Sequence, residues 1–103
     1  MSLIKIKPES PEQAAKRLEL ALDAHIDSVA QSYRYDSIRT MVTYATSENP
    51  TFGAEGRAAV KFRDACYVKA YEIQEDVQLG NRDIPTEAEL IAEMPLFETF
   101  LTV

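Results

Sequence analysis

One proline-free stretch, residues 53–80, constrains the fold of this chain more than any other feature. It reads GAEGRAAVKFRDACYVKAYEIQEDVQLG, and its internal glycine, Gly56, lies near its start. Apolar residues recur in it at steps of three or four, which is the spacing of one face of an α-helix. They are Ala59, Phe62, Cys66, Ala70, Ile73 and Val77. The stretch therefore predicts one long helix.

A second apolar set on the same stretch is formed by Val60, Tyr67 and Tyr71, at steps of seven and four. At about 100° per residue, this set falls on nearly the opposite side of the helix. Two apolar faces require two neighbours. The helix is therefore either the middle element of a small bundle or a bundle helix that also contacts another molecule. Because tyrosine suits half-exposed interfaces, this set is a candidate partner surface.

The chain has 103 residues, of which 46% are hydrophobic and 27% charged. This length predicts one domain, with enough core to fold without a metal or disulfide. No apolar run is long enough to cross a bilayer, and the first residues lack the pattern of a secretory signal. The single cysteine, Cys66, shares the core face of the long helix, which predicts a buried and inert thiol.

The formal net charge is −6, which argues against non-specific binding to nucleic acid. Residues 72–103 contain eight acidic side chains and one basic one, Arg82, whereas basic residues gather in the first half of the long helix. This asymmetry is either an ordinary solvated surface or a means of steering a partner or orienting two copies of the chain.

Both ends of the chain are apolar and stand outside the clearest helical patterns. Residues 1–9 begin MSLIKIK and predict a short extended arm, which is either free or paired in an oligomer. Residues 96–103 read LFETFLTV and form an apolar C-terminal tail. Leu96, Phe97 and Phe100 are too apolar to be left in water, so we expect them to pack on the helices or on a partner.

Residues 10–95 predict the helical domain, and the helix boundaries can be read from capping signals. Ser10, followed by proline and then Gln13, predicts the start of a first helix. Asp36 or Ser37 caps a second, shorter helix, and Thr51 is expected to cap the long one. Gly80 with Asn81 ends the long helix. A Thr86–Glu89 capping box opens a short fourth helix.

The sequence therefore predicts an all-α fold, a small bundle of three to four helices with one long central helix. The predicted core consists of the apolar faces of these helices. Its members are Leu18, Leu22, Ile26, Val29, Ile38, Met41, Val42, Phe62, Cys66, Ile73, Val77, Leu90 and Ile91.

No motif for catalysis, a cofactor or a metal stands out in the sequence. The single histidine, His25, has no second histidine or cysteine at ligand spacing, and a core-edge position is expected for it. Glu72, Glu75 and Asp76 are interpreted as solvated helix residues. Arg63 and Asp64 are adjacent, so each is expected to pair with another helix or cap. We expect no enzymatic activity, no cofactor and no small-molecule substrate.

The order of short motifs from Tyr35 to Phe97 resembles a group of small tail proteins of tailed bacteriophages and prophages, encoded near tail-fibre genes. The motifs are YDSI at residues 35–38, YA at 44–45, NPTF at 49–52 with AE at 54–55, FRDA at 62–65, GNR at 80–82 and PTEAELIAEMP at 85–95. Members of the group commonly carry tryptophan where this chain has Phe62 and Tyr67.

The resemblance implies a tail-fibre assembly chaperone or tail accessory protein that acts by protein–protein binding, in the host cytoplasm or in the virion tail. It implies a tail or tail-fibre protein as partner and carries no catalytic residues. The alternatives are a minor structural tail subunit and a small acidic phage inhibitor of a host protein. The candidate surface for a partner or for a homodimer is Val60, Tyr67, Tyr71, Leu96, Phe97 and Phe100.

Overall fold

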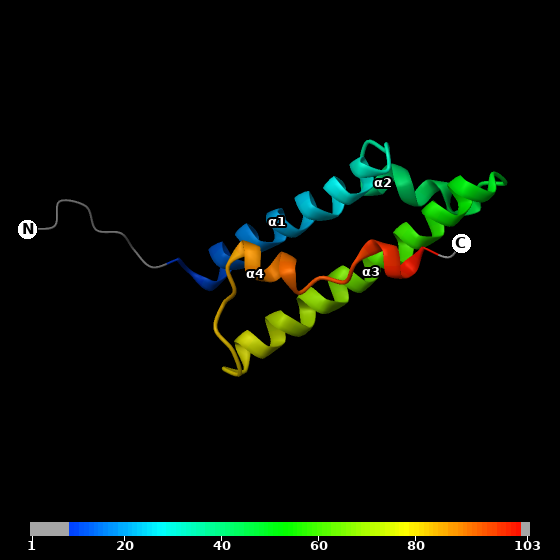
Figure 1. Cartoon of the computed structure of the whole chain (residues 1–103). Coiled ribbons are helices and arrows are strands. Elements are labelled where there is room, and N and C mark those ends of the chain that lie inside the picture. Colours follow the sequence, from blue (N-terminus) through cyan, green and yellow to red (C-terminus); the bar gives the residue numbers. More distant parts are fainter. Residues whose placement is uncertain (1–8, 102–103) are drawn as a thin grey trace, which may run out of the picture.

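The computed structural model describes residues 9–101, and these residues form helices without strands. Helix α1 (Pro11–Ser32) and the long helix α3 (Pro50–Gln78) run in opposite directions along the molecule (Figure 1). They are joined by the short α2 (Ile38–Met41) and the 3₁₀ helix η1 (Val42–Thr46). Helix α4 (Glu87–Ala92) packs against α1, and the chain then returns along α3 as the 3₁₀ helix η2 (Phe97–Phe100). The all-α prediction with one long helix is confirmed.

Two capping boxes predicted from the sequence are present. The Ser10 hydroxyl accepts a hydrogen bond from the Gln13 amide, and the Gln13 side chain accepts one from the Ser10 amide. Thr86 and Glu89 make the same reciprocal pair at the start of α4. Each pair satisfies amide groups that have no partner inside the helix, which fixes where both helices begin.

The long helix begins earlier than the sequence pattern suggested. Asn49, not Thr51, is its cap: the Asn49 side-chain oxygen accepts hydrogen bonds from the amides of Thr51 and Phe52. Pro50 then occupies the first helical position, where its missing amide hydrogen costs nothing. At the other end Gly80 has a φ of 77°, the left-handed conformation expected of a C-terminal cap.

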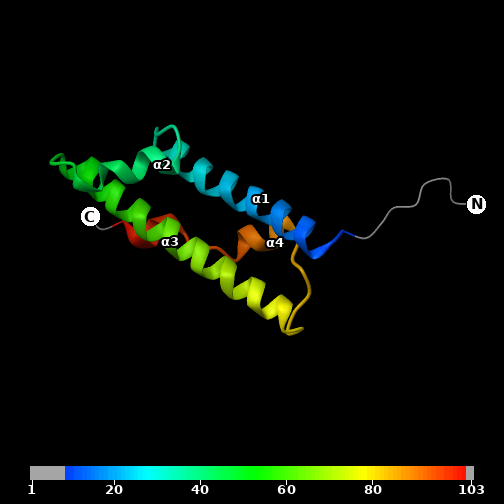
Figure 2. The same ribbon diagram turned by 180° about the vertical axis from the view of Figure 1, so that it is seen from behind.

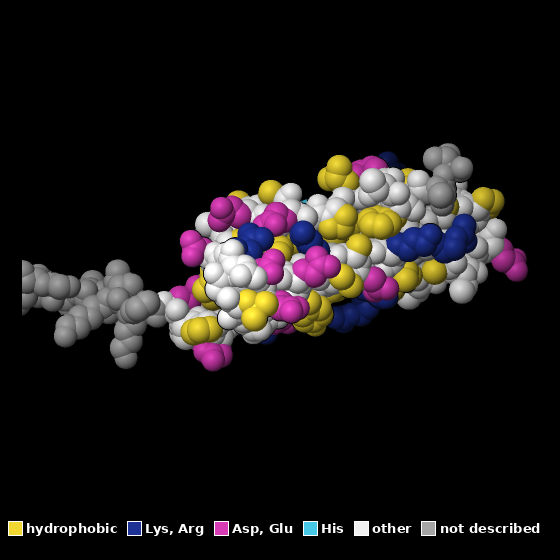
Figure 3. Space-filling view, turned by 90° about the horizontal axis from the view of Figure 1, so that it is seen from below, with side chains coloured by type: hydrophobic (Ala, Val, Ile, Leu, Met, Phe, Trp, Pro, Cys, Tyr) yellow, Lys and Arg dark blue, Asp and Glu magenta, His cyan; other side chains and the backbone are white. Residues whose placement is uncertain are grey.

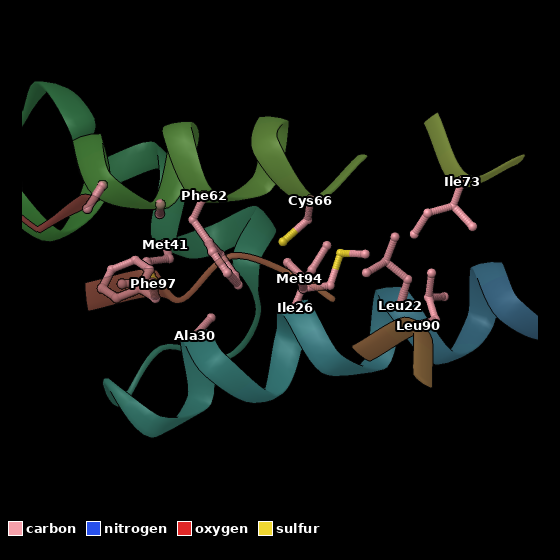
Figure 4. Close-up of a cluster of buried hydrophobic side chains, with 12 residues drawn as sticks. Leu22, Ile26, Ala30, Met41, Phe62, Cys66, Ile73, Leu90, Met94 and Phe97 are labelled. Carbon is pink, nitrogen blue, oxygen red and sulfur yellow. The ribbon is translucent and has the colours of Figure 1, made fainter. Parts of the chain in front are cut away.

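The core lies between α1 and α3 and is closed by α2, α4 and η2 (Figure 4). Every residue of the predicted core is buried in this cluster or packs against it. The centre is formed by Ile26, Met41, Phe62 and Cys66, whose side chains have almost no contact with solvent. The structure adds residues that the prediction had left out of the core. They are Ala30, Ala58, Ala59, Met94 and Phe97.

The C-terminal tail supplies part of this core. Phe97 is 2% exposed, and its ring lies 4.7 Å from the ring of Tyr33 and 5.6 Å from that of Phe62. Phe100 packs against the cluster beside Phe62. The placement of Phe97 on a partner surface was therefore wrong, because this side chain fills the space between α1 and α3. Residues 1–8 of the predicted arm and residues 102–103 of the tail lie outside the described residues.

Cys66 is expected to react slowly with a thiol reagent in the native protein. Its side chain is fully buried, and this burial raises the pKa of the thiol to about 11, so little thiolate exists at neutral pH. Absorbance during labelling with a disulfide reagent measures the rate, first in native buffer and then in denaturant. Native labelling as fast as that of the unfolded chain would contradict the assigned helix face.

Candidate functional site

An apolar groove of about 320 Å³ lies between the first half of α1 and the second half of α3. Figures 1 and 2 both show the two helices diverging at this end of the molecule, with α4 between them. Leu18 and Leu22 contribute from α1, Ile73 and Val77 from α3, and Leu90 from α4. At this end the buried residues of the core cluster stop at Leu22 on α1 and Ile73 on α3, whereas both helices extend further. The groove lies where they do so.

One end of the groove is closed by a hydrogen bond between its two walls. The Tyr67 hydroxyl on α3 donates to Oδ1 of Asp23 on α1 at 2.5 Å. Burial, together with this bond and the nearby carboxylates, raises the pKa of Tyr67. At the opposite end the linker after α3 contributes Ile84 and Pro85. The groove is therefore a bounded site about three helical turns long on the α1 side.

The α1 edge of the groove is acidic. Glu12, Glu19, Asp23 and Asp27 follow one another at steps of seven and four, so they share one side of α1. Glu19 lines the groove itself, and the charges of Asp23, Asp27 and Glu19 all act on the Tyr67 hydroxyl. The groove thus combines an apolar floor with one lining carboxylate, Glu19, next to an acid-rich side of α1 that also holds Lys16.

The excess of acidic side chains extends beyond the groove to this whole end of the molecule. Residues 9–23 and 67–93, which form this end of the molecule, hold eleven acidic side chains and four basic ones. On the face drawn in Figure 3 the acidic side chains lie mostly on the left half of the described residues, and a basic strip lies on the right half. The lopsided charge of the sequence is therefore also a lopsided charge in space.

The residues predicted from the sequence as a partner surface differ in how exposed they are. Tyr71 lines the groove and is 68% exposed, and Leu96 is 70% exposed. Val60 and Tyr67 are half-buried. Tyr67 packs against the core cluster and reaches α1, so the second apolar face adjoins the core face of α3 instead of opposing it. Sequence reasoning identified the two tyrosines but not the α1 residues that face them, because that pairing depends on the angle between the helices.

Motif residues gather at the other end of the molecule, where α2 and η1 connect α1 to α3. The ring of Tyr44 lies 5.2 Å from Tyr35 and 5.8 Å from Phe52. The Tyr35 hydroxyl donates to Glu55 at 2.8 Å, and burial with this bond raises the pKa of Tyr35 to about 12. With Asn49 as helix cap, these contacts hold the α2–η1–α3 turn together. These contacts explain why the motif residues occur at this spacing in the sequence.

The next residues to place are those weighed in the sequence as metal ligands or reactive groups. Between residues 9 and 101 no group of three or more histidine, cysteine or acidic residues could hold a metal ion. His25 packs edge-on against Phe62, with ring centroids 6.4 Å apart, and burial lowers its pKa. Arg63 and Asp64 pair with each other at 3.0 Å rather than with other helices, which corrects the expectation for both.

No helix within residues 9–101 combines the length and the apolar character that a membrane crossing requires. Comparisons of the chain with protein families, with curated proteins and with solved structures find no match.

Proposed function

We propose that this chain binds another protein during assembly of a bacteriophage or prophage tail, as a tail-fibre assembly chaperone or tail accessory protein. The observation that carries the proposal is the ordered set of motifs from Tyr35 to Phe97, which resembles the small tail proteins encoded near tail-fibre genes. The host cytoplasm is then its place of action during assembly.

The contacts made by the motif residues support this reading of the resemblance. Tyr35, Tyr44, Phe52 and Glu55 come from three separate motifs and meet in one connection. Phe62 comes from a further motif and lies at the centre of the core. Residues that must contact one another are constrained in type and spacing, so a shared motif order is what a shared fold would produce.

The groove supports binding over catalysis. Its floor is apolar, it has a hydroxyl–carboxylate pair at one end, and it is about as large as the smallest common ligand pockets. Tyrosine, which supplies two of the α3 residues that line the groove, is enriched in protein–protein interfaces. A concave apolar surface with aromatic edges suits the capture of an apolar segment of another protein.

Co-expression with the tail-fibre protein of the same phage or prophage tests the function. We expect more soluble, correctly assembled fibre when this chain is present and a complex between the two that survives purification. Mass spectrometry of purified virions then separates the alternatives: absence indicates a chaperone, and presence indicates a minor tail subunit. Equal fibre yield with and without the chain, and no complex, would contradict the proposal.

A further inference from the structure

We propose that the groove between α1 and α3 binds a basic amphipathic helix of the partner protein; this inference rests on the proposed binding function and names the chemistry of its ligand. The helix would lie along the groove with its apolar side chains on the floor. Its lysine or arginine side chains would face the carboxylates on α1.

The shape of the groove favours a helix as the occupant. Both long walls are helices, Pro11–Ser32 and Pro50–Gln78, whose backbone groups are already used in their own hydrogen bonds away from the ends. A strand would need free backbone groups along an edge, and residues 9–101 contain no strand edge to offer them. A helix needs only apolar contact with the floor. Docked beside α1 and α3, it would extend the bundle where these helices diverge.

The floor of the groove supplies the apolar contact. Leu18, Ala70 and Val77 are only half-buried, although each packs against the core cluster on one side. A volume of about 320 Å³ corresponds to roughly ten water molecules at liquid density. Replacing that water with leucine-sized side chains removes apolar surface from solvent on both partners, which is favourable.

Charge identifies the kind of helix. The α1 wall presents Glu19 in the groove lining, and Asp23 meets Tyr67 of the opposite wall, while Lys16 lies one turn before Glu19 on the same side of α1. A cationic helix is attracted to this wall, whereas an acidic one is repelled. The end of the molecule as a whole carries the same excess of acidic side chains.

The arginines at this end are already engaged with carboxylates. Arg17 lies 3.0 Å from Glu9 and 3.7 Å from Glu87, and Arg82 lies 2.7 Å from Glu93. Their charges are therefore already paired, so the acidic excess of this end favours a basic partner.

The test uses the full chain and three fluorescent peptides of about 18 residues, long enough to cover a groove of about three turns. The first has leucines at helical spacing flanked by lysine and arginine. The second keeps the leucines but replaces every basic residue with glutamate. The third has the composition of the first in an order that destroys the apolar face. Fluorescence anisotropy measures each affinity.

We expect the basic amphipathic peptide to bind with micromolar affinity that falls as salt is added. The other two should bind at least roughly ten-fold more weakly. The proposal would be overturned if the first peptide showed no binding at roughly 100 µM. It would also be overturned if the acidic peptide bound equally well.

Two pairs of variants test where on the protein the peptide binds. Tyr71→Ala removes an aromatic side chain at the groove edge and should weaken binding roughly ten-fold, whereas Val68→Ala, at a residue of the same helix that is 57% exposed and does not line the groove, should not. Glu19→Lys should weaken binding of the basic peptide, whereas Glu48→Lys, an exposed residue at the far end, should not. Equal losses in both members of a pair would contradict the site.

Light scattering of the free protein at micromolar concentration checks the competing occupant, a second copy of this chain. A monomer mass is expected. A stable dimer that Tyr71→Ala converts to monomer would show that the groove is a self-association surface and overturn the inference. If the fibre protein still binds Tyr71→Ala with unchanged affinity, the proposed function stands and only the site is wrong.

Discussion

Replacing Gly56 with alanine is expected to destabilise the protein by about 2 kcal/mol, against the direction that helix propensity predicts. Alanine is better than glycine inside a helix by about 1 kcal/mol. In this structure a β-carbon at position 56 would lie 2.3 Å from the Ala45 amide nitrogen and 2.4 Å from the Tyr44 carbonyl carbon. Both are backbone atoms, so relief requires η1 to move away from α3, and such overpacking costs about 1–3 kcal/mol or more.

Urea unfolding followed by circular dichroism measures the effect as a shift of the midpoint at constant slope. Ala24→Gly, a change at an exposed position of α1, calibrates the propensity contribution and should cost about 1 kcal/mol. A Gly56→Ala protein as stable as the original, or more stable, would show that α3 and η1 do not approach as closely as the structure has them.

The second large effect is expected for Phe97→Ala. Phe97 is 2% exposed and contacts the rings of both Tyr33 and Phe62, so its removal leaves a cavity between α1 and α3. Truncation of a buried phenylalanine typically costs about 3–5 kcal/mol. Most small domains have a total stability of about 5–15 kcal/mol, so this one change removes a large share of it.

The neighbouring residue provides the matched control. Leu96 is 70% exposed, and Leu96→Ala should change stability by no more than about 0.5 kcal/mol. Phe97→Leu, which keeps most of the apolar volume, should fall between the two and remains measurable if Phe97→Ala does not fold. Equal effects of Phe97→Ala and Leu96→Ala would mean that the tail does not pack into the core.

Local signals in the sequence predict the helices well because they act over one or two turns. The reciprocal bonds of Ser10 with Gln13 and of Thr86 with Glu89 need only residues three apart. The left-handed φ of Gly80 follows from the absence of a side chain at the end of a long apolar pattern. The core faces of α1 and α3 follow from helical spacing in the same way.

Features that depend on how distant segments meet could not be predicted. Phe97 follows a proline in a tail with no clear helical pattern, so its position in the core is set by the space left between α1 and α3. Such space is not visible in a single segment.

The sequence alone indicates some, but not all, of the residues that form the candidate groove. The spacing of Tyr67 and Tyr71 marks them as a set apart from the core face, but it does not place Asp23 opposite Tyr67, forty-four residues away in the chain. The acidic row on α1 is likewise readable as a helix face, although only the fold puts it beside an apolar floor.

Hydrogen exchange of the full chain, with and without the tail-fibre protein proposed as its partner, tests most directly whether the chain binds a partner through this groove. Peptides from residues 11–22 and 67–78 should exchange more slowly in the complex, while those covering the connection at residues 42–52 should change little. Complex formation with protection only at residues 42–52, and none along the groove, would contradict the account.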